Sequence, residues 1–419
     1  MGLLSRKIVS NSLWMMLEKF LGVFGVIFVM SYVAKYIGPE NFGKIALSTT
    51  LFTFVQTFSW FGNQEILFKR VSRNTQSGLQ YLENTQNIRK FLFFSLTFPI
   101  LLGLYIFSDL LTLIFGISTA FSSYFLTQDI YNIYNNATLR SYINAISNIT
   151  GLFIALGIRY FIVEYKLDYA YLALPIVLVT LIPFSLKKFI FNRQDKAQQV
   201  TCAAYKKYYL WAGGALVISS LSVSFYTQIT SLMLAALTST YELGIYAAAV
   251  TIGSAWTFVN FSIITSIFSK IYRENNRLES YKMIAKLNLI VICVSLGVIA
   301  VLALLGEWII MTLYGADYED AYHLLLILAS ATMCGGLGTV AARLIIKEEN
   351  YTYISKKMLV VALSSIPISY MMIHLFGLKG AAYSVFLIEF LSLTVFNYLY
   401  KNGLIFKIHF YPFFKHTLK

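Results

Sequence analysis

The stretch 284–305, IAKLNLIVICVSLGVIAVLALL, decides the fold class of this chain, because its 22 residues include a single charged side chain, Lys286. About 20 apolar residues in an α-helix cross the hydrocarbon core of a bilayer. The whole chain shares this character, since 58% of its 419 residues are hydrophobic and 12% are charged, against roughly 25% charged in a soluble domain. A soluble protein would expose the surplus apolar surface as large patches. We therefore predict an all-α integral membrane protein.

Similar apolar runs recur along the chain and predict about twelve transmembrane helices. The first run is long enough to span, so we expect it to remain in the membrane rather than to be cleaved as a signal peptide. The region 104–138 departs most from the pattern, because Asp109, Gly116 and a polar stretch interrupt it. The predicted spans are 13–36, 44–64, 88–108, 118–138, 141–163, 168–187, 209–235, 243–268, 284–305, 322–346, 354–376 and 379–400.

Basic residues alternate between the predicted loops and assign each loop to one side of the membrane. Of the 33 lysines and arginines, 27 fall on one side, at the two termini and in or next to every second loop, whereas five fall in or next to the other loops. Because Lys and Arg are retained on the cytoplasmic side during insertion, both termini are predicted to be cytoplasmic. The net charge of +14 is then explained by topology and by contact with anionic lipid in the bilayer. No nucleic-acid partner is expected.

The sequence lacks the patterns that mark soluble active sites. Its three cysteines, Cys202, Cys293 and Cys334, match no zinc or redox spacing. It contains no Walker loop, no HExxH, no GxSxG and no GxGxxG after a strand. The glycine-rich segment 335–338 lies inside an apolar run, where close helix packing explains it better than phosphate binding. We expect a transporter without cofactor or metal, and not an enzyme.

The two halves of the chain echo each other at an offset of about 200 residues. Six spans in each half make the repeat parallel, an arrangement typical of transporters whose two bundles rock to give alternating access. The echoes are Leu13-Trp14 with Leu210-Trp211, 40–43 with 242–244, Phe115-Gly116 with Tyr314-Gly315, and 167–170 with 378–381. The predicted divisions are an N-terminal six-helix bundle at 1–190, a cytoplasmic linker at 191–207, a C-terminal six-helix bundle at 208–400 and a basic cytoplasmic tail at 401–419.

Three segments carry a family likeness: 11–43, which ends in YIGPENFG, 313–321, LYGADYEDA, and 376–384, FGLKGAAYS. Together they resemble the polysaccharide-biosynthesis flippases, O-antigen translocases among them, of the multidrug/oligosaccharidyl-lipid/polysaccharide (MOP) exporter superfamily. One departure is Gly22, which stands where many relatives carry a basic residue. Any role of that charge must then belong to another residue.

The resemblance implies both a fold and a cargo. The fold is that of the multidrug and toxic compound extruders (MATE). The cargo is an undecaprenyl-diphosphate-linked oligosaccharide, such as the O-antigen repeat unit of lipopolysaccharide biosynthesis, which moves from the cytoplasmic to the periplasmic leaflet of a bacterial inner membrane. Coupling to a proton or sodium gradient and contact with polysaccharide polymerase machinery are further expectations of the resemblance.

Ionisable residues inside predicted spans are costly and are candidate functional residues for that reason. Lys19 is a candidate ligand of the diphosphate with Glu18 balancing its charge, and the alternative is a pair that snorkels to the interface. Asp129 lies near the middle of its predicted span and is a candidate to line a cavity or carry a proton. It shares one predicted helix face with Asn132, Asn136 and Arg140. The alternative for this face is hydrogen bonding that holds helices together.

The remaining candidates are spread over five predicted spans. Gln56, Trp60 and Asn63 share a face of one span and form a candidate sugar platform, or else a packing face with an interfacial anchor. Glu389 stands in the middle of the last span with no evident partner. The candidate list is completed by Asn260, Arg159 and Arg343. Arginine suits phosphate through bidentate hydrogen bonds, whereas snorkelling is the simpler account of both arginines.

Two other functions fit parts of this pattern. A cation-coupled multidrug exporter would share the fold. A membrane-embedded oligosaccharide polymerase or lipid-linked glycosyltransferase would carry a large outer loop, or an acidic metal site after the first span. The first predicted outer loop offers only Glu40, which argues against this second alternative.

Overall fold

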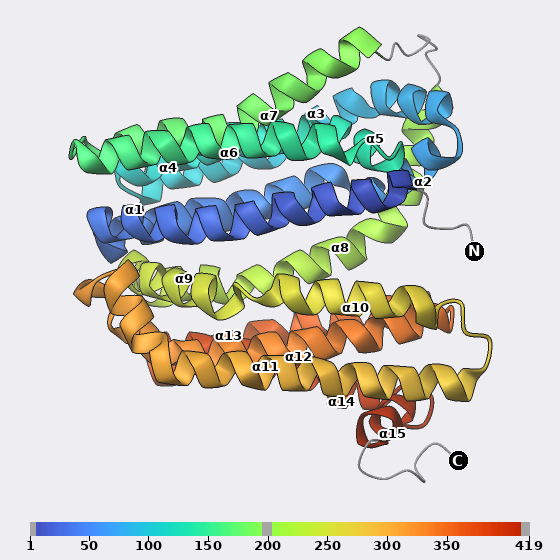
Figure 1. Ribbon diagram of the computed structural model, residues 1–419. Coiled ribbons are helices and arrows are strands. Elements are labelled where there is room, and N and C mark those ends of the chain that lie inside the picture. The colour runs from blue at the N-terminus through green and yellow to red at the C-terminus, as the bar shows by residue number, and fades with distance from the viewer. Residues whose placement is uncertain (1–5, 195–202, 412–419) are drawn as a thin grey trace. The chain divides into compact units, whose positions relative to one another are not determined.

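The computed structural model describes residues 6–194 and 203–411, and within these residues it contains helices and no strands. Figure 1 shows the long helices of each half lying side by side. The helices of the first half are α1 (Arg6–Trp60), α2 (Asn63–Arg73), α3 (Thr75–Phe107), α4 (Leu110–Gln128), α5 (Ile130–Ala137), α6 (Ser141–Glu164), η1 (Tyr169–Leu172) and α7 (Ala173–Gln194). Those that follow are α8 (Ala203–Leu237), α9 (Thr240–Ser254), α10 (Thr257–Ile271), α11 (Arg277–Leu313), η2 (Ala316–Tyr318), α12 (Asp320–Lys347), α13 (Tyr351–Leu393), α14 (Val395–Tyr398) and α15 (Leu404–Phe410).

Two of the long helices are each a pair of membrane spans joined at a glycine. Ten helices of the described chain are long and apolar enough to cross a membrane, and two of them, Trp14–Trp60 and Tyr351–Tyr398, have 47 and 48 residues. Each would be about 70 Å long if straight, against a hydrocarbon core of about 30 Å. Gly38 (φ 74°) and Gly377 (φ 55°) break them with backbone angles that favour glycine. Counting each as two spans agrees with the predicted twelve.

Among the predicted spans whose boundaries differ from the structure, two show what sets the ends. The span 118–138 in fact begins at Leu110, where the Asp109 side chain caps α4 by accepting a hydrogen bond from the Thr112 backbone, and it breaks at Asp129 before α5. The span 44–64 ends at Trp60, since Phe61 and Gly62 have positive φ and a separate helix, α2, follows. Hydropathy reports how apolar a segment is, whereas these ends are set by local capping and turns.

The contacts divide the chain into an N-terminal unit, Met1–Ser224, and a C-terminal unit, Phe225–Lys419. One core of the N-terminal unit includes Leu67 of α2, Leu82 of α3 and Tyr209 of α8. The core of the C-terminal unit includes Leu287 of α11 and Val340 of α12. Residues 195–202 of the predicted linker and 412–419 of the predicted tail lie outside the described residues.

Three of the four predicted echoes fall at equivalent places in the helix order. Leu13-Trp14 and Leu210-Trp211 lie eight residues into α1 and α8, and 40–43 and 242–244 begin the second span of each half. The pair 167–170 and 378–381 joins the last two spans of each half. The fourth echo is wrong, because Gly315 lies in the turn before η2 whereas Gly116 lies within α4. The two halves therefore share a span order and not a constant residue offset.

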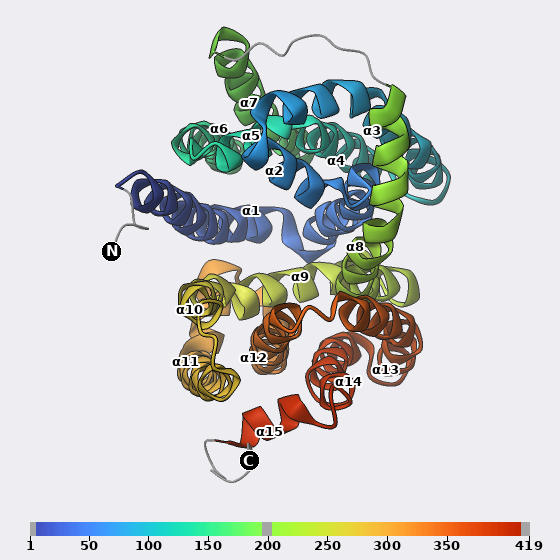
Figure 2. The same cartoon turned by 90° about the vertical axis from the view of Figure 1, so that its right-hand side faces the viewer.

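The short helix α15 lies along one side of the C-terminal unit, next to α11 and α14, as Figure 2 shows by viewing α10, α11 and α12 nearly end-on. Ile405 and Ile408 anchor it in the core of the C-terminal unit. His409 follows, and its Nδ1 lies 3.1 Å from the Tyr398 hydroxyl. Burial lowers the pKa of His409 to about 4, so the docked helix holds a neutral imidazole at pH 7.

Acid should release α15 through this histidine. A folded-state pKa below the unfolded value of about 6.5 gives stability that is present above pH 6.5 and is lost as the pH falls toward 4. We expect the hydrogen-exchange protection factors of α15 to fall between pH 7 and pH 5 in the wild-type chain. In His409→Asn, which keeps a polar side chain without a titrating ring, protection should not change with pH. Equal pH dependence in the two proteins would assign the effect to another group.

Candidate functional site

The break between α4 and α5 places a carboxylate inside the N-terminal unit. Asp129 is the N-cap of α5, and its Oδ1 accepts a hydrogen bond of 3.2 Å from the Asn132 backbone. Its other oxygen, Oδ2, pairs with the Lys187 ammonium of α7. The Asp129 side chain is 8% exposed and that of Lys187 is 1% exposed, so this is a buried ion pair. Removing one partner of such a pair leaves an uncompensated charge.

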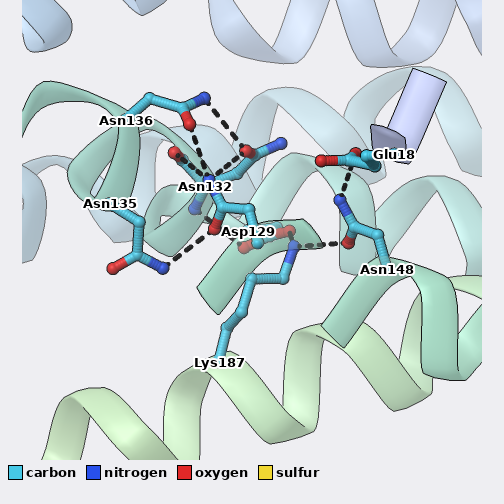
Figure 3. Close-up of polar contacts among 8 residues, drawn as sticks. Glu18, Asp129, Asn132, Asn135, Asn136, Asn148 and Lys187 are labelled. Atoms are coloured by element: carbon cyan, nitrogen blue, oxygen red, sulfur yellow. Dashed lines mark hydrogen bonds and ion pairs between the residues drawn. The ribbon is translucent and has the colours of Figure 1, made fainter. Parts of the chain in front are cut away.

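Hydrogen bonds extend the ion pair to α6 and α1 (Figure 3). Lys187 Nζ donates to Asn148 Oδ1 at 3.0 Å, and Asn148 Nδ2 donates to Glu18 Oε1 at 2.7 Å. Four helical elements thus meet through the chain Glu18–Asn148–Lys187–Asp129, which we call the N-terminal charge network. With both carboxylates ionised it carries two negative charges and one positive charge. Lys19, next to Glu18, is exposed and stays available to an anion.

A cluster of asparagines fastens α5 to α6 beside this network (Figure 3). The Asn144 amide nitrogen donates to the side-chain oxygens of Asn132 and Asn136 at 2.7 and 2.9 Å. Its oxygen accepts a hydrogen bond of 2.8 Å from Asn135. The predicted stripe of Asn132 and Asn136 is therefore engaged in holding helices together, which was the alternative predicted for it. Arg140 lies beyond α5 as the N-cap residue of α6, so it does not continue the same helix face.

The predicted platform on the second span is divided between two helices. Trp60 is the last residue of α1 and lies beneath the Arg89 guanidinium, whose carbon is 5.5 Å from the ring centroid. Asn63 begins α2, where its Oδ1 accepts a hydrogen bond of 2.5 Å from the Tyr81 hydroxyl and its Nδ2 donates to the Tyr209 carbonyl at 3.3 Å. Both residues are buried and serve packing, whereas Gln56 is half-buried on α1.

The C-terminal unit contains a cavity of about 460 Å³ between α8, α9, α10, α12 and α13. Glu389 and Asn260 line it together with Tyr226. Asn260 donates to the Ser295 hydroxyl at 3.4 Å, while its buried Oδ1 has no partner within the described residues. The structure thus places two of the predicted residues, Asn260 and Glu389, in one pocket, which we call the acid-lined pocket after Glu389, the one carboxylate among its lining residues.

The glycines of 335–338 make room for these polar groups. A Cβ built on Gly335 would lie 3.4 Å from Glu389 Oε2, and one on Gly336 would lie 3.2 Å from Asn260 Nδ2. Close packing was the predicted role of this segment, and it packs against the two polar side chains of the cavity. Larger side chains at either position would fill the cavity.

Two predicted arginines lie outside both sites. Arg159 is buried in α6. Arg343 of α12 donates to the Thr265 hydroxyl at 3.0 Å, and its guanidinium carbon lies 5.3 Å from the Phe261 ring centroid. Neither residue belongs to the N-terminal charge network, and neither lines the acid-lined pocket.

Sequence reasoning missed three buried cations by assigning them to cytoplasmic flanks. Lys187 belongs to the N-terminal charge network, Arg89 covers Trp60, and the buried Lys357 donates to Asn397 Oδ1 at 2.8 Å. Lys187 precedes Lys188 at the end of an apolar run, as flanking lysines do. Adjacent residues of a helix point about 100° apart, so one of them can turn inward, but the sequence does not tell which.

The model of a family described as "Polysaccharide biosynthesis protein" matches residues 8–268, more than half of the chain. The chain belongs to this family. Among curated proteins, the capsular polysaccharide biosynthesis protein CapF of Staphylococcus aureus is 25% identical over 190 residues, which are 45% of this chain and 48% of CapF. The match thus spans about half the length of that relative.

Solved structures share the fold along nearly the whole chain of this family member. The lipid II flippase MurJ, in an inward-closed conformation, matches with a TM-score of 0.73 over 97% of this chain and 91% of that chain, at 13% identity. An inward-facing MATE multidrug-resistance transporter of the MOP superfamily matches with a TM-score of 0.68 over 92% and 95% of the two chains, at 12% identity. These matches confirm the predicted MATE-like membrane fold.

Proposed function

We propose that the chain is a flippase that moves a polyprenyl-diphosphate-linked oligosaccharide from the cytoplasmic to the periplasmic leaflet of a bacterial inner membrane. The observation that carries this proposal is the family match over residues 8–268, joined to a fold that MurJ, a lipid II flippase, also has. Alternating access between the two helical units supplies the movement. Sugar hydroxyls and phosphates need a polar path across the hydrocarbon core, and the polyprenyl tail stays in lipid.

The ionisable residues inside the spans suit this cargo. The exposed ammonium at Lys19 attracts the diphosphate, and Glu18 next to it is already held by the Asn148 amide. The second part of the proposal assigns energy coupling to the C-terminal pocket. The Glu389 carboxylate can accept a proton, and together with the Asn260 oxygen, which has no partner within the described residues, it can bind a small cation. Intramembrane carboxylates of this kind commonly serve ion coupling in transporters.

A leaflet assay tests the proposed function. Cells depleted of this chain should accumulate the lipid-linked repeat unit on the cytoplasmic leaflet, and the wild-type gene should restore its outward delivery. Normal delivery with an altered glycan length would instead indicate a polymerase. Normal delivery with raised sensitivity to toxic cations would indicate the multidrug exporter. Either result would reject the flippase.

Glu389→Gln tests the coupling role. The amide keeps the size of the side chain and removes its charge and its proton, so outward delivery should fall roughly tenfold or more, the scale of a coupling free energy of 1–3 kcal/mol. Glu307→Gln, at an exposed position of α11, is the matched control and should transport normally. Equal transport by the two variants, at equal protein levels, would remove Glu389 from the mechanism.

A further inference from the structure

A second pocket opens at the same α4–α5 break that creates the N-terminal charge network. It has a volume of about 240 Å³ and lies between α3, the α4–α5 junction and α7. Gln128, the last residue of α4 and the neighbour of Asp129, lines it. The break therefore supports two sites at once, because Asp129 engages Lys187 while the preceding residue reaches this pocket.

Gln128 is the feature that distinguishes this pocket from an ordinary packing defect. The residue is 5% exposed, and neither its amide nitrogen nor its amide oxygen forms a hydrogen bond within the described residues. Leaving the donor or the acceptor of a buried amide unpaired is unfavourable, because the group has lost its hydrogen bonds to water. A buried side chain with both a donor and an acceptor open suits a ligand that offers both, as a hydroxyl or an acetamido group does.

The other side chains that line the pocket restrict the chemical class of its ligand. Glu83 of α3 and Lys188 of α7 stand exposed at its lining, and their charges cancel. Neutral surroundings of this kind favour neither a phosphate nor a metal cation. The lining also includes the aromatic rings of Tyr131, Phe184 and Phe191, which offer apolar faces. Hydrogen-bonding groups next to aromatic faces suit a pyranose ring, which has hydroxyls at its edge and C–H groups on its faces.

The volume of the pocket limits the size of the ligand. The volume of about 240 Å³ equals that of about eight waters at roughly 30 Å³ each. Sites for drug-sized ligands occupy about 300–1,000 Å³. The pocket thus suits one sugar ring better than a multi-ring drug.

We propose that the Gln128 pocket is a sugar subsite that binds one neutral pyranose ring. Given the proposed flippase function, on which this inference rests, the ring belongs to the head group of the lipid-linked glycan. Gln128 makes the central hydrogen bonds, Glu83 and Lys188 bind hydroxyls at the rim, and the aromatic side chains pack against the ring. The subsite lies in the N-terminal unit and is separate from the pocket of Glu389.

Saturation-transfer NMR on the full-length protein in lipid nanodiscs tests this subsite directly. The probes are methyl α-D-glucopyranoside and its 2-acetamido-2-deoxy counterpart, each at millimolar concentration. We expect saturation transfer from the wild-type protein to the ring protons of at least one probe. Gln128→Leu should weaken binding roughly tenfold or more, since two hydrogen bonds of about 1 kcal/mol each are lost. Asn87→Ala, at an exposed position of α3 outside the pocket, should bind like the wild type.

A second variant, Glu83→Ala, separates loss of binding from misfolding. Glu83 is exposed, so its loss should weaken sugar binding without lowering the protein yield. Absence of transfer from the wild-type protein to either probe, or equal transfer from wild type and Gln128→Leu, would overturn the subsite and leave a water-filled pocket. The leaflet assay separates this result from the proposed function. Wild-type delivery without sugar binding rejects the subsite alone, whereas Gln128-dependent binding without delivery rejects the flippase alone.

Discussion

Replacing Lys187 by methionine should destabilise the N-terminal unit by about 3–5 kcal/mol, the typical cost of removing one partner from a buried ion pair. Asp129 would keep its charge in a site where it is 8% exposed, and Asn148 would lose the donor to its Oδ1. The expected result is a marked fall in the amount of folded protein in the membrane, together with a lower unfolding temperature in detergent. Transport should fall with it.

The neighbouring lysine provides the control for stability. Lys188→Met changes an exposed side chain, and surface charges contribute about 0–1 kcal/mol. The double variant Asp129→Asn, Lys187→Met removes both charges and should recover much of the stability that the single variant loses. If Lys187→Met is as stable as Lys188→Met, or if the double variant is worse than the sum of the single ones, the ion pair does not carry this stability.

The second large effect is expected from Gly380→Ala. The kink at Gly377 folds the second span of α13 back on the first, and a Cβ on Gly380 would lie 1.9 Å from the Met372 carbonyl oxygen. Added methylenes in a packed core cost about 1–3 kcal/mol when side chains move aside. Here the obstacle is backbone, which has no rotamer to change, so we expect a larger cost. The measurement is the unfolding temperature of the purified full-length protein.

A glycine with open space around it provides the control variant. Gly297 lies within α11 with no atom within 4 Å of a built Cβ, so Gly297→Ala should be neutral or slightly stabilising through helix propensity. Unfolding temperatures for Gly380→Ala and Gly297→Ala that agree within error would show that the turn at Gly377 opens easily.

The spans were predictable because each is a continuous apolar segment that needs no distant partner. Residues 284–305 read as a span from composition alone, and α11 covers them. The polar stretch within 104–138 showed that the pattern is interrupted there, but the position of the break at Asp129 was not predictable, since it depends on a cap and on a lysine 58 residues away. The amphipathic helix α2 was missed for a related reason, because it is too polar to register as a span.

The candidate site residues were likewise predictable only in part. The sequence by itself determined that Glu18, Asp129 and Glu389 are carboxylates inside membrane spans, because a charge within an apolar run is visible in one dimension. Only the tertiary structure decided their partners: Lys187 and Asn148 for the network, Asn260 and two glycines for the acid-lined pocket. The same holds for Gln128, whose unpaired amide appears only when the surrounding helices are in place. Hydrophobicity is a sum over neighbouring residues, whereas a binding site depends on distances between residues that the sequence keeps far apart.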